Sequence, residues 1–322
     1  MNYFLLFDNK DSDKEFITKH IGIPIITFYS PQSKKKIYCW LKGVFKVIFN
    51  SNKNDTIICW FDFQAILCFW ICKILLLHRN IVCINLLLKY KSTLKNKIIR
   101  FLYKKALISK NFRASVTSSE YGKWINSKLG ICIDYTLIHD VFHDSYRYNK
   151  ILPQNKNTVF CGGYNGRDWS FIIQIAKKMP YITFNFIMPY NSYEKIKYEI
   201  PKNVNIKCNI PYDSFMVELC QSSIVCLPLN TESPAGLIVM FQAAANMKYI
   251  LTTDTCTTRE YLSDGKGALL PPDVNCWIGK INEVLSSQDS YKESSKILLN
   301  YLKSKCSEEE FIKNLRKMIL KY

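Results

Sequence analysis

The sequence predicts an α/β protein of two successive domains, each built around a mainly parallel sheet. Short runs of β-branched and aromatic residues alternate with longer segments of helical periodicity, which is typical of parallel α/β proteins. The length of 322 residues corresponds to two domains of about 150 residues each. A polar, proline-containing segment, Tyr146–Asn157, interrupts the alternation and is predicted to link the domains.

In the first half, strands are predicted at Tyr3–Asp8, Pro24–Tyr29, Thr56–Phe61, Asn80–Asn85, Ala114–Ser118 and Thr136–Ile138. Helices are predicted at Phe63–Leu77, Thr93–Ser109 and Ser119–Leu129. We expect Ser119 to cap the last helix, because a serine hydroxyl accepts a first-turn N–H. Ile57–Leu77 is very apolar, but its polar residues favour a buried strand and helix over a membrane span, which needs about 20 apolar residues.

A second α/β series follows the predicted linker. Strands are predicted at Thr158–Cys161, Thr183–Met188, Val204–Lys207, Ser223–Leu227 and Tyr249–Thr252. Helices are predicted at Trp169–Lys178, Tyr212–Gln221 and Leu237–Asn246. Ser307–Lys321 has the pattern of an amphipathic helix that opens with a capping box of Ser307 and Glu310.

The charge lies mostly in the first half. The chain has a net charge of +18, and residues 1–155 hold 24 basic and 10 acidic residues against 20 and 16 in the remainder. Phe63–Ser119 contains no acidic residue at all. A field this positive favours anionic partners such as nucleic acid, phospholipid headgroups or phosphate-bearing substrates. The hydrophobic content of 48% excludes intrinsic disorder.

The thirteen cysteines are predicted to be free thiols in a reducing cytoplasm. Their number is odd, no secretory signal peptide opens the chain, and no Cys-x-x-Cys pair occurs. Cys68 and Cys72 share a predicted helix and suit core packing better than structural zinc. His139 and His143 could share a helix face as metal ligands, but their place after a strand favours a loop at the domain boundary.

Three segments of the second half, which each begin at the end of a predicted strand, hold the candidate binding and catalytic residues. Phe160–Trp169 runs from a strand through three glycines to Arg167 and a helix start, which together make a plausible diphosphate cradle. An ordinary glycine turn with Arg167 paired to Asp168 is the alternative. Leu227–Ala245 repeats the strand, small-residue loop and helix, and Glu232 or Gln242 could bond sugar or ribose hydroxyls. A Pro/Gly turn with exposed polar residues is the alternative for this segment. Thr252–Tyr261 is predicted to be a polar loop.

In this order and spacing, the segments resemble the donor half of a GT-B-fold glycosyltransferase of the broad family 4 (group 1) type. The resemblance covers residues 158–275 and includes Asn209–Leu229, whereas residues 1–150 show only a general α/β pattern. It implies two Rossmann-like domains that face each other across a cleft. The expected boundaries are 1–150 for the acceptor side, 151–305 for the donor side, and 306–322 for a C-terminal helix that returns to the N-terminal domain.

The resemblance also implies roles for particular residues. Arg167 would neutralise the donor diphosphate, and Gly162 and Gly163 would let the backbone approach it. Gln242 would bind the ribose, Tyr212 would lie near the nucleobase, and Glu232 is the second candidate catalytic residue. Amides for the distal phosphate would come from Ser233, Ala235, Gly236 and Leu237.

The sequence departs from the family pattern at several points. The family has a Glu-x7-Glu pair, whereas Glu232 and Gln242 are ten residues apart and the second is an amide. The glycine-rich loop near the N-terminus is missing, and Asn85 stands where a His-Asp pair is usual. These departures leave the role of Glu232 and the stereochemical outcome open.

The resulting hypothesis is a metal-independent glycosyltransferase without a cofactor, which moves sugar from a nucleotide-diphosphate sugar to a saccharide acceptor in surface glycan assembly. The basic, aromatic segment Lys89–Arg113 suits an anionic membrane, so a lipid-linked acceptor and a peripheral position at the inner face of a bacterial cell membrane are expected. A solvated helix face is the alternative for this segment. An inactive GT-B-like partner subunit and a nucleic-acid-binding protein are the competing functions, although no nucleic-acid-binding motif occurs.

Overall fold

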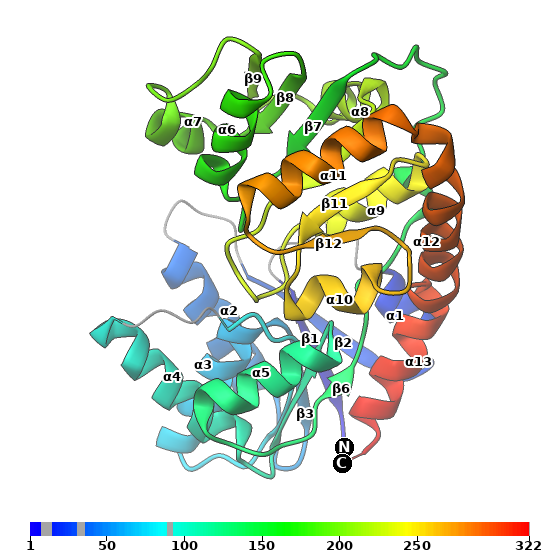
Figure 1. The fold of residues 1–322 in the computed structure, drawn as a ribbon. Helices are drawn as coiled ribbons and strands as arrows, with labels where there is room; N and C mark the ends of the chain where they lie inside the picture. Colours follow the sequence, from blue (N-terminus) through cyan, green and yellow to red (C-terminus); the bar gives the residue numbers. More distant parts are fainter. Residues whose placement is uncertain (8–14, 31–35, 89–92, 322) are drawn as a thin grey trace. The chain divides into compact units, whose positions relative to one another are not determined.

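The computed structural model describes residues 1–7, 15–30, 36–88 and 93–321. Within these ranges the chain forms two compact units, Met1–Val141 with Glu308–Tyr322 and Phe142–Ser307. Each unit is an α/β layer structure around one six-stranded parallel sheet, as Figure 1 shows for each unit separately. Asp8 and Lys89–Ser92, which the sequence assigned to a strand and to the basic segment, lie outside the described residues.

The first unit has the strand order β2-β1-β3-β4-β5-β6. Its strands are β1 Tyr3–Phe7, β2 Ile25–Tyr29, β3 Thr56–Phe61, β4 Asn80–Asn85, β5 Phe112–Val116 and β6 Thr136–Leu137. Its helices are α1 Phe16–His20, α2 Lys36–Asn50, α3 Asp62–Ile74, α4 Leu94–Leu107, α5 Ser119–Leu129 and α13 Glu308–Ile319. The stretch Ile57–Leu77 is a strand and a helix, as predicted, and no helix in the described ranges is long and apolar enough to span a membrane.

The C-terminal helix α13 packs on the sheet of the first unit. Its apolar face, including Phe311, Leu315 and Met318, joins the buried residues of β1, β3 and β4 in one core. Arg113 of β5 fixes the end of the helix by donating to the carbonyls of Met318 at 3.3 Å and Lys321 at 2.6 Å. The last turn of the helix and the residues after it are therefore tied to a strand far away in sequence.

The second unit has the strand order β12-β11-β10-β7-β8-β9. Its strands are β7 Thr158–Gly162, β8 Thr183–Met188, β9 Val204–Cys208, β10 Ile224–Leu227, β11 Ile250–Thr253 and β12 Ala268–Leu270. Its α-helices are α6 Trp169–Lys178, α7 Tyr190–Ile196, α8 Tyr212–Gln221, α9 Leu237–Ala245, α10 Cys256–Leu262, α11 Val274–Ser286 and α12 Lys292–Lys305. When the strands are renumbered from 1 for β7 to 6 for β12, the order reads 6-5-4-1-2-3. This is a doubly wound sheet, and its switch point lies between β7 and β10.

The structure corrects the predicted division of the chain. The second unit begins at Phe142, before the predicted linker Tyr146–Asn157, because the Phe142 ring packs against Phe241 at 6.0 Å and its N–H donates to the Cys306 carbonyl at 2.7 Å. The segment around the short 3₁₀ turn Asp144–Tyr146 is thus part of the second unit and not a free connection.

Two local predictions were wrong. Ser118, not Ser119, caps α5, because its hydroxyl accepts the N–H of Tyr121 at 3.3 Å and Ser119 is already helical. The segment predicted as a polar loop, Thr252–Tyr261, ends β11 and forms most of α10. Thr255 caps that helix in a capping box with Thr258, which is how a threonine-rich segment begins a helix.

Candidate functional site

Two loops of the second unit meet at the switch point of its sheet. One connects β7 to α6 and the other connects β10 to α9. Arg167 and Leu229 form an isolated antiparallel bridge between them. Asp168 donates its N–H to the Pro228 carbonyl, and Asn230 donates to the Gly166 carbonyl, each at 3.0 Å. In open parallel sheets, ligands bind at the carboxyl ends of the strands on either side of the switch point.

Gly166 allows the two loops to touch. Its φ is +69°, and a Cβ there would lie 2.8 Å from both the Cβ of Ala235 and the Cγ2 of Thr231. A side chain at this position would meet both a strained backbone and the wall of the opposite loop. The contact therefore requires glycine, and it places Ala235, one of the predicted binding residues, against the first loop.

Arg167 lies between the two loops and is 6% exposed. Its Nε donates to the Gly162 carbonyl at 2.8 Å and its Nη1 to the Asn165 carbonyl at 3.3 Å. A Cβ on Gly163 would lie 2.7 Å from Nη2, and one on Gly236 would lie 2.9 Å from Nη1. Gly163 and Gly236 therefore make room for the guanidinium itself.

Arg167 is not paired with Asp168, which was the alternative interpretation of the sequence. The Asp168 carboxylate caps α6 by accepting the N–H of Phe171 at 3.0 Å. Among the described residues, the hydrogen-bond partners of the Arg167 guanidinium are the two carbonyl oxygens. Burial lowers the pKa of Arg167 to about 10, so the side chain remains cationic at neutral pH. A buried cation with neutral partners favours a nearby anion.

Helix α9 begins beside this cation. Gly236 is its N-cap with a φ of +79°, and Leu237 is the first helical residue. The first N–H groups of a helix have no intrahelical acceptor and carry the positive end of the helix dipole. Arg167 and the start of α9 thus concentrate positive charge at one point. Ser233, a predicted amide donor to the distal phosphate, donates its N–H to the Thr231 hydroxyl at 3.2 Å.

Gly162 has a packing role that the sequence did not indicate. A Cβ at this position would lie 2.5 Å from the Phe160 ring and 2.8 Å from the Phe215 ring. These two rings make an edge-to-face contact at 5.2 Å. Gly162 therefore accommodates aromatic packing beneath the loop, while its carbonyl orients Arg167.

Gln242 and Tyr212 lie together, within hydrogen-bonding distance of each other. Gln242 is 4% exposed on α9, and its Oε1 has no hydrogen-bond partner among the described residues. Tyr212 is the exposed first residue of α8. Burial raises the pKa of Tyr212, and a hydrogen bond from the Gln242 side chain acts in the opposite direction. A buried amide oxygen without a donor is costly, and a ligand hydroxyl would satisfy it.

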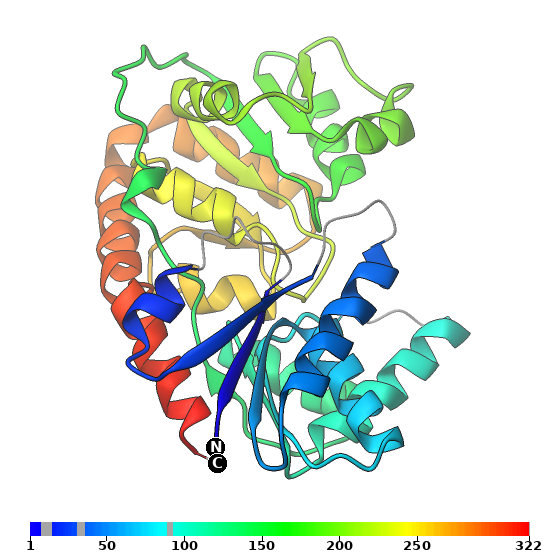
Figure 2. The same ribbon diagram turned by 180° about the vertical axis from the view of Figure 1, so that it is seen from behind.

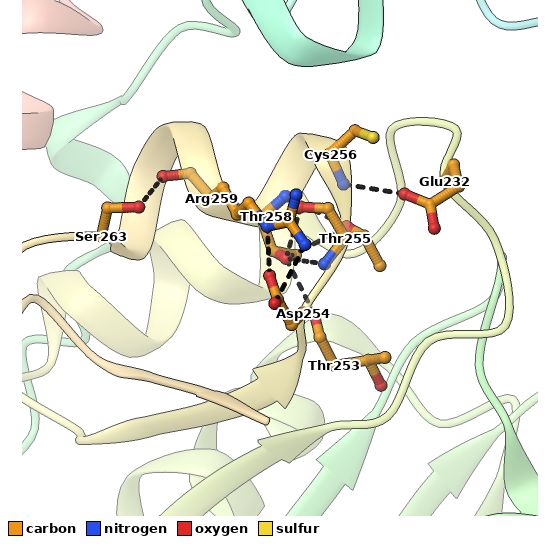
Figure 3. A network of polar contacts seen from close by, with 8 residues as sticks. All are labelled: Glu232, Thr253, Asp254, Thr255, Cys256, Thr258, Arg259 and Ser263. Atoms are coloured by element: carbon orange, nitrogen blue, oxygen red, sulfur yellow. Dashed lines mark hydrogen bonds and ion pairs between the residues drawn. The ribbon is translucent and has the colours of Figure 1, made fainter. Parts of the chain in front are cut away.

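The contacts of Glu232 lead to α10 and not to Gln242. Its Oε2 accepts the N–H of Cys256 at 2.8 Å, and its carbonyl accepts the Thr257 hydroxyl at 3.0 Å, as Figure 3 shows for the carboxylate. A carboxylate at the start of a helix is stabilised by the dipole and the free N–H groups. In this structure Glu232 anchors the β10–α9 loop to α10.

Helix α10 and two exposed tyrosines that follow the strands β7 and β8 were not predicted from the sequence. Tyr164 lies within the β7–α6 loop, and Tyr190 is the first residue of α7, two residues after the end of β8. An aromatic residue two or three positions after the end of a predicted strand was the available signal. In the described ranges, no group of three or more His, Cys, Asp or Glu side chains is placed to hold a metal ion.

A scan against protein-family models finds no match, and no curated protein matches the sequence. Solved structures do match. HepE of Anabaena, crystallised with UDP and glucose, has a TM-score of 0.71 at 12% identity, with 100% of both chains covered. WaaG, a glycosyltransferase of lipopolysaccharide biosynthesis, has a TM-score of 0.69 at 10% identity over 100% of both chains.

A glycosyltransferase from Rickettsia africae has a TM-score of 0.67 at 12% identity, with 99% of both chains covered. These similarities extend over the whole chain, although the identities are low. They agree with the two six-stranded parallel sheets and with the switch point at which Arg167 lies. The chain therefore has the GT-B fold, with two Rossmann-like units.

Proposed function

We propose that this protein is a glycosyltransferase that transfers sugar from a nucleotide-diphosphate sugar to a saccharide acceptor. The observation that carries the proposal is the buried Arg167 guanidinium at the switch point, between Gly163 and Gly236. A diphosphate is the ligand that suits a buried cation and the start of a helix. HepE and WaaG, which share the fold, support the same class of donor and reaction.

The proposed chemistry follows from the charge that develops on the leaving nucleoside diphosphate. Arg167 and the amides at the start of α9 would stabilise that charge as the bond to the sugar breaks. These groups are held in place before the donor binds, so little reorganisation accompanies the reaction. On this proposal they supply the charge stabilisation that a metal ion gives elsewhere, and the nucleotide sugar is a substrate without a further cofactor.

The same proposal assigns Gln242 to the ribose and Tyr212 to the neighbourhood of the base. The unpartnered Oε1 of Gln242 supports the first assignment, because a ribose hydroxyl is a donor. Glu232 is assigned to positioning, since its carboxylate already accepts the Cys256 N–H. The acceptor is proposed to be a lipid-linked saccharide in bacterial surface glycan assembly, which would place the protein at the inner face of the cell membrane.

A thermal-shift panel of nucleoside diphosphates and nucleotide sugars tests the donor. At a ligand concentration of 100 times Kd, the matching nucleotide is expected to stabilise the protein by about 2.7 kcal/mol. That corresponds to a rise in Tm of roughly 5–10 °C for a unit of this size. The free nucleoside without phosphate is the control and should give a much smaller shift. If no nucleoside diphosphate or nucleotide sugar raises Tm, the proposal fails.

Gln242→Leu in the same panel tests the ribose assignment. Without ligand the variant should change little in stability, because removal of the buried unpartnered oxygen offsets the loss of the hydrogen bond to Tyr212. Its affinity for the matching nucleotide should fall about tenfold, because the loss of one hydrogen bond costs about 1.4 kcal/mol of binding free energy. Unchanged nucleotide affinity would remove Gln242 from the donor site.

A catalytically inactive GT-B-like partner subunit remains the second candidate. It is favoured by the neutral Gln242 and by the engagement of Glu232 with α10. Both candidates bind the donor, so turnover separates them. Release of nucleoside diphosphate from the stabilising nucleotide sugar supports the enzyme, whereas binding without release in the presence of lipid-linked acceptors supports the partner.

A further inference from the structure

Helix α4 exposes an apolar stripe. Leu94, Ile98, Phe101 and Ile108 recur at spacings of four, three and seven residues, so they share one face of the helix. All are exposed, and Leu94 is 74% exposed. The opposite face, which includes Tyr103, packs in the core of the first unit. A surface helix of a water-soluble protein normally presents polar residues outward, so this stripe needs a partner.

Helix α2 has the same character. Its inner face buries Val44, Val47 and Ile48, while Phe45 and Phe49 point to solvent. The two exposed rings stack with centroids 6.0 Å apart and planes inclined by 13°. Phe49 is 71% exposed. An exposed stacked pair of phenylalanines adds a second apolar stripe to the same unit.

The end of α3 contributes three more exposed aliphatic residues, Ile74, Leu75 and Leu76. Leu76 is 88% exposed and has a φ of +54°, a left-handed conformation that a leucine rarely adopts. The N–H of Leu75 bonds to the carbonyl of Ile71 and that of Leu76 to the carbonyl of Lys73, so this backbone is held in place. The turn thus holds a leucine away from the core.

These three helices are neighbours on one face of the sheet, where α2 packs on α3 and α3 on α4. The Trp40 and Phe63 rings, 3.8 Å apart, join the first pair. Trp70 joins the second pair, because its indole N–H donates to the Leu102 carbonyl at 3.3 Å. Figure 2 shows the helices side by side, from blue to cyan. We call the exposed apolar residues of α2, the end of α3 and α4 the α2–α4 face.

The segments that form the α2–α4 face carry a strong excess of positive charge. Between Phe16 and Ser119 the sequence holds only two carboxylates, Asp55 and Asp62, and both are buried. Exposed lysines occur on these helices and in the loops next to them, at positions Lys42, Lys46, Lys53, Lys73, Lys95, Lys97, Lys105 and Lys110. Lys105 lies over the Phe101 ring at 5.7 Å, which keeps its ammonium beside the stripe.

We infer that the α2–α4 face lies in the interfacial layer of an anionic lipid bilayer, with its aliphatic and phenylalanine side chains inserted among the acyl chains. Apolar residues flanked by lysines match a surface that is negatively charged outside and apolar beneath. A second copy of the chain would bring lysines against lysines. Nucleic acid would match the lysines but would leave the exposed leucines and isoleucines in water.

The inference rests on the proposed function in one respect, because a lipid-linked acceptor is the reason for the protein to bind a membrane. It goes further than the expectation from Lys89–Arg113, because α2 and the end of α3 take part and because insertion of apolar groups adds to attraction by charge. The second unit offers a contrast. Most of its exposed large apolar side chains are tyrosines, which include Tyr164, Tyr190 and Tyr198.

Co-sedimentation of the full chain with vesicles tests the inference. The protein should pellet with vesicles of phosphatidylcholine and phosphatidylglycerol and only weakly with phosphatidylcholine alone. Ile98→Gln with Phe101→Gln should weaken the partition coefficient by on the order of tenfold, because both side chains leave the acyl layer. The matched control, Ile151→Gln with Ile297→Gln, changes two exposed residues of the second unit and should bind as the parent does.

Salt separates insertion from attraction. Lys95→Gln, Lys97→Gln and Lys105→Gln together should weaken binding at low salt, while the parent should retain part of its binding in 1 M salt, where the Debye length is about 3 Å. The Ile98 and Phe101 variant should lose that residual binding. Phe49→Gln, on another helix, should act in the same direction as the α4 variant.

The inference is overturned if the parent does not pellet with anionic vesicles, or if the Ile98 and Phe101 variant binds as well as the control. It is also overturned if the same variants abolish RNA binding or self-association and leave vesicle binding unchanged. Each variant is first checked for an unchanged Tm and for binding of the nucleotide identified by the thermal-shift panel. A variant that loses vesicle binding but keeps nucleotide binding is altered only at the α2–α4 face. The membrane proposal and the nucleotide-sugar proposal can therefore fail independently of each other.

Discussion

Arg167→Ala is expected to lower kcat/KM for sugar transfer by on the order of 10²-fold, the usual effect of removing one preorganised charge stabiliser. The guanidinium is buried between the two loops, and its hydrogen bonds to the carbonyls of Gly162 and Asn165 hold it in position. Alanine removes the positive charge that the departing diphosphate would meet. The measurement is steady-state kinetics with the nucleotide sugar that stabilises the parent protein.

Arg167→Lys is the informative companion to this variant. Lysine keeps the positive charge but lacks the planar guanidinium group that lies next to Gly163 and Gly236. We expect its activity to lie between those of the parent and the alanine variant. Turnover like that of the parent in Arg167→Ala would contradict the assigned role.

Gly166→Ala is expected to destabilise the second unit by about 2–5 kcal/mol. A left-handed residue costs about 1–2 kcal/mol, and overpacking a close contact costs a further 1–3 kcal/mol. Both costs apply here, because φ is +69° and the new Cβ would lie 2.8 Å from the Ala235 Cβ. Chemical denaturation measures the loss, and the separated loops should also weaken nucleotide binding.

The chain provides two matched controls for this substitution. Gly265 has a φ of +77° and open space around a Cβ, so Gly265→Ala should cost only about 1–2 kcal/mol. Gly279 lies within α11 with open space and no positive φ, so Gly279→Ala should stabilise by up to about 1 kcal/mol. A loss at Gly166 no larger than at Gly265 would show that the loops do not press together there.

Much of the fold could be predicted from the sequence because the inner strands of both sheets are mostly buried. Continuous apolar runs such as Thr56–Phe61 and Thr183–Met188 have the predicted bounds in the structure. Helix α2 was missed, because Ile37, Phe45 and Phe49 lie on its outer face and blur the amphipathic pattern. Helix α10 was missed because its threonines favour strands and loops unless a capping box forms.

The candidate site was predicted in part. Arg167, Gly163 and Gly236 converge, since their positions follow from loops that come directly after strands of a parallel sheet. Glu232 could not be placed in advance, because its partner is the N–H of a helix that the sequence did not predict. The packing role of Gly162 depends on the Phe215 ring of α8, a contact between segments far apart in sequence.

The division of the chain needed the structure for a similar reason. The polarity of Tyr146–Asn157 suggested a linker, but Tyr148 donates its N–H to the Asn246 side chain at 2.9 Å, and the Asn246 amide donates to the Tyr146 carbonyl at 2.9 Å. A polar segment can be ordered by such bonds to a helix end. Hydrophobicity patterns do not contain that information, whereas Phe142, four residues earlier, marks where the second core begins.

The central claim is that Arg167 and the start of α9 hold the diphosphate of a donor nucleotide. Calorimetric titration of the parent and Arg167→Ala with the matching nucleoside diphosphate, and with the same nucleoside without phosphate, tests it most directly. We expect the parent to prefer the diphosphate strongly and the variant to lose about 2–3 kcal/mol of diphosphate binding, in line with a charged hydrogen bond, with no change toward the nucleoside. Equal affinity of the two proteins for the diphosphate would contradict the account.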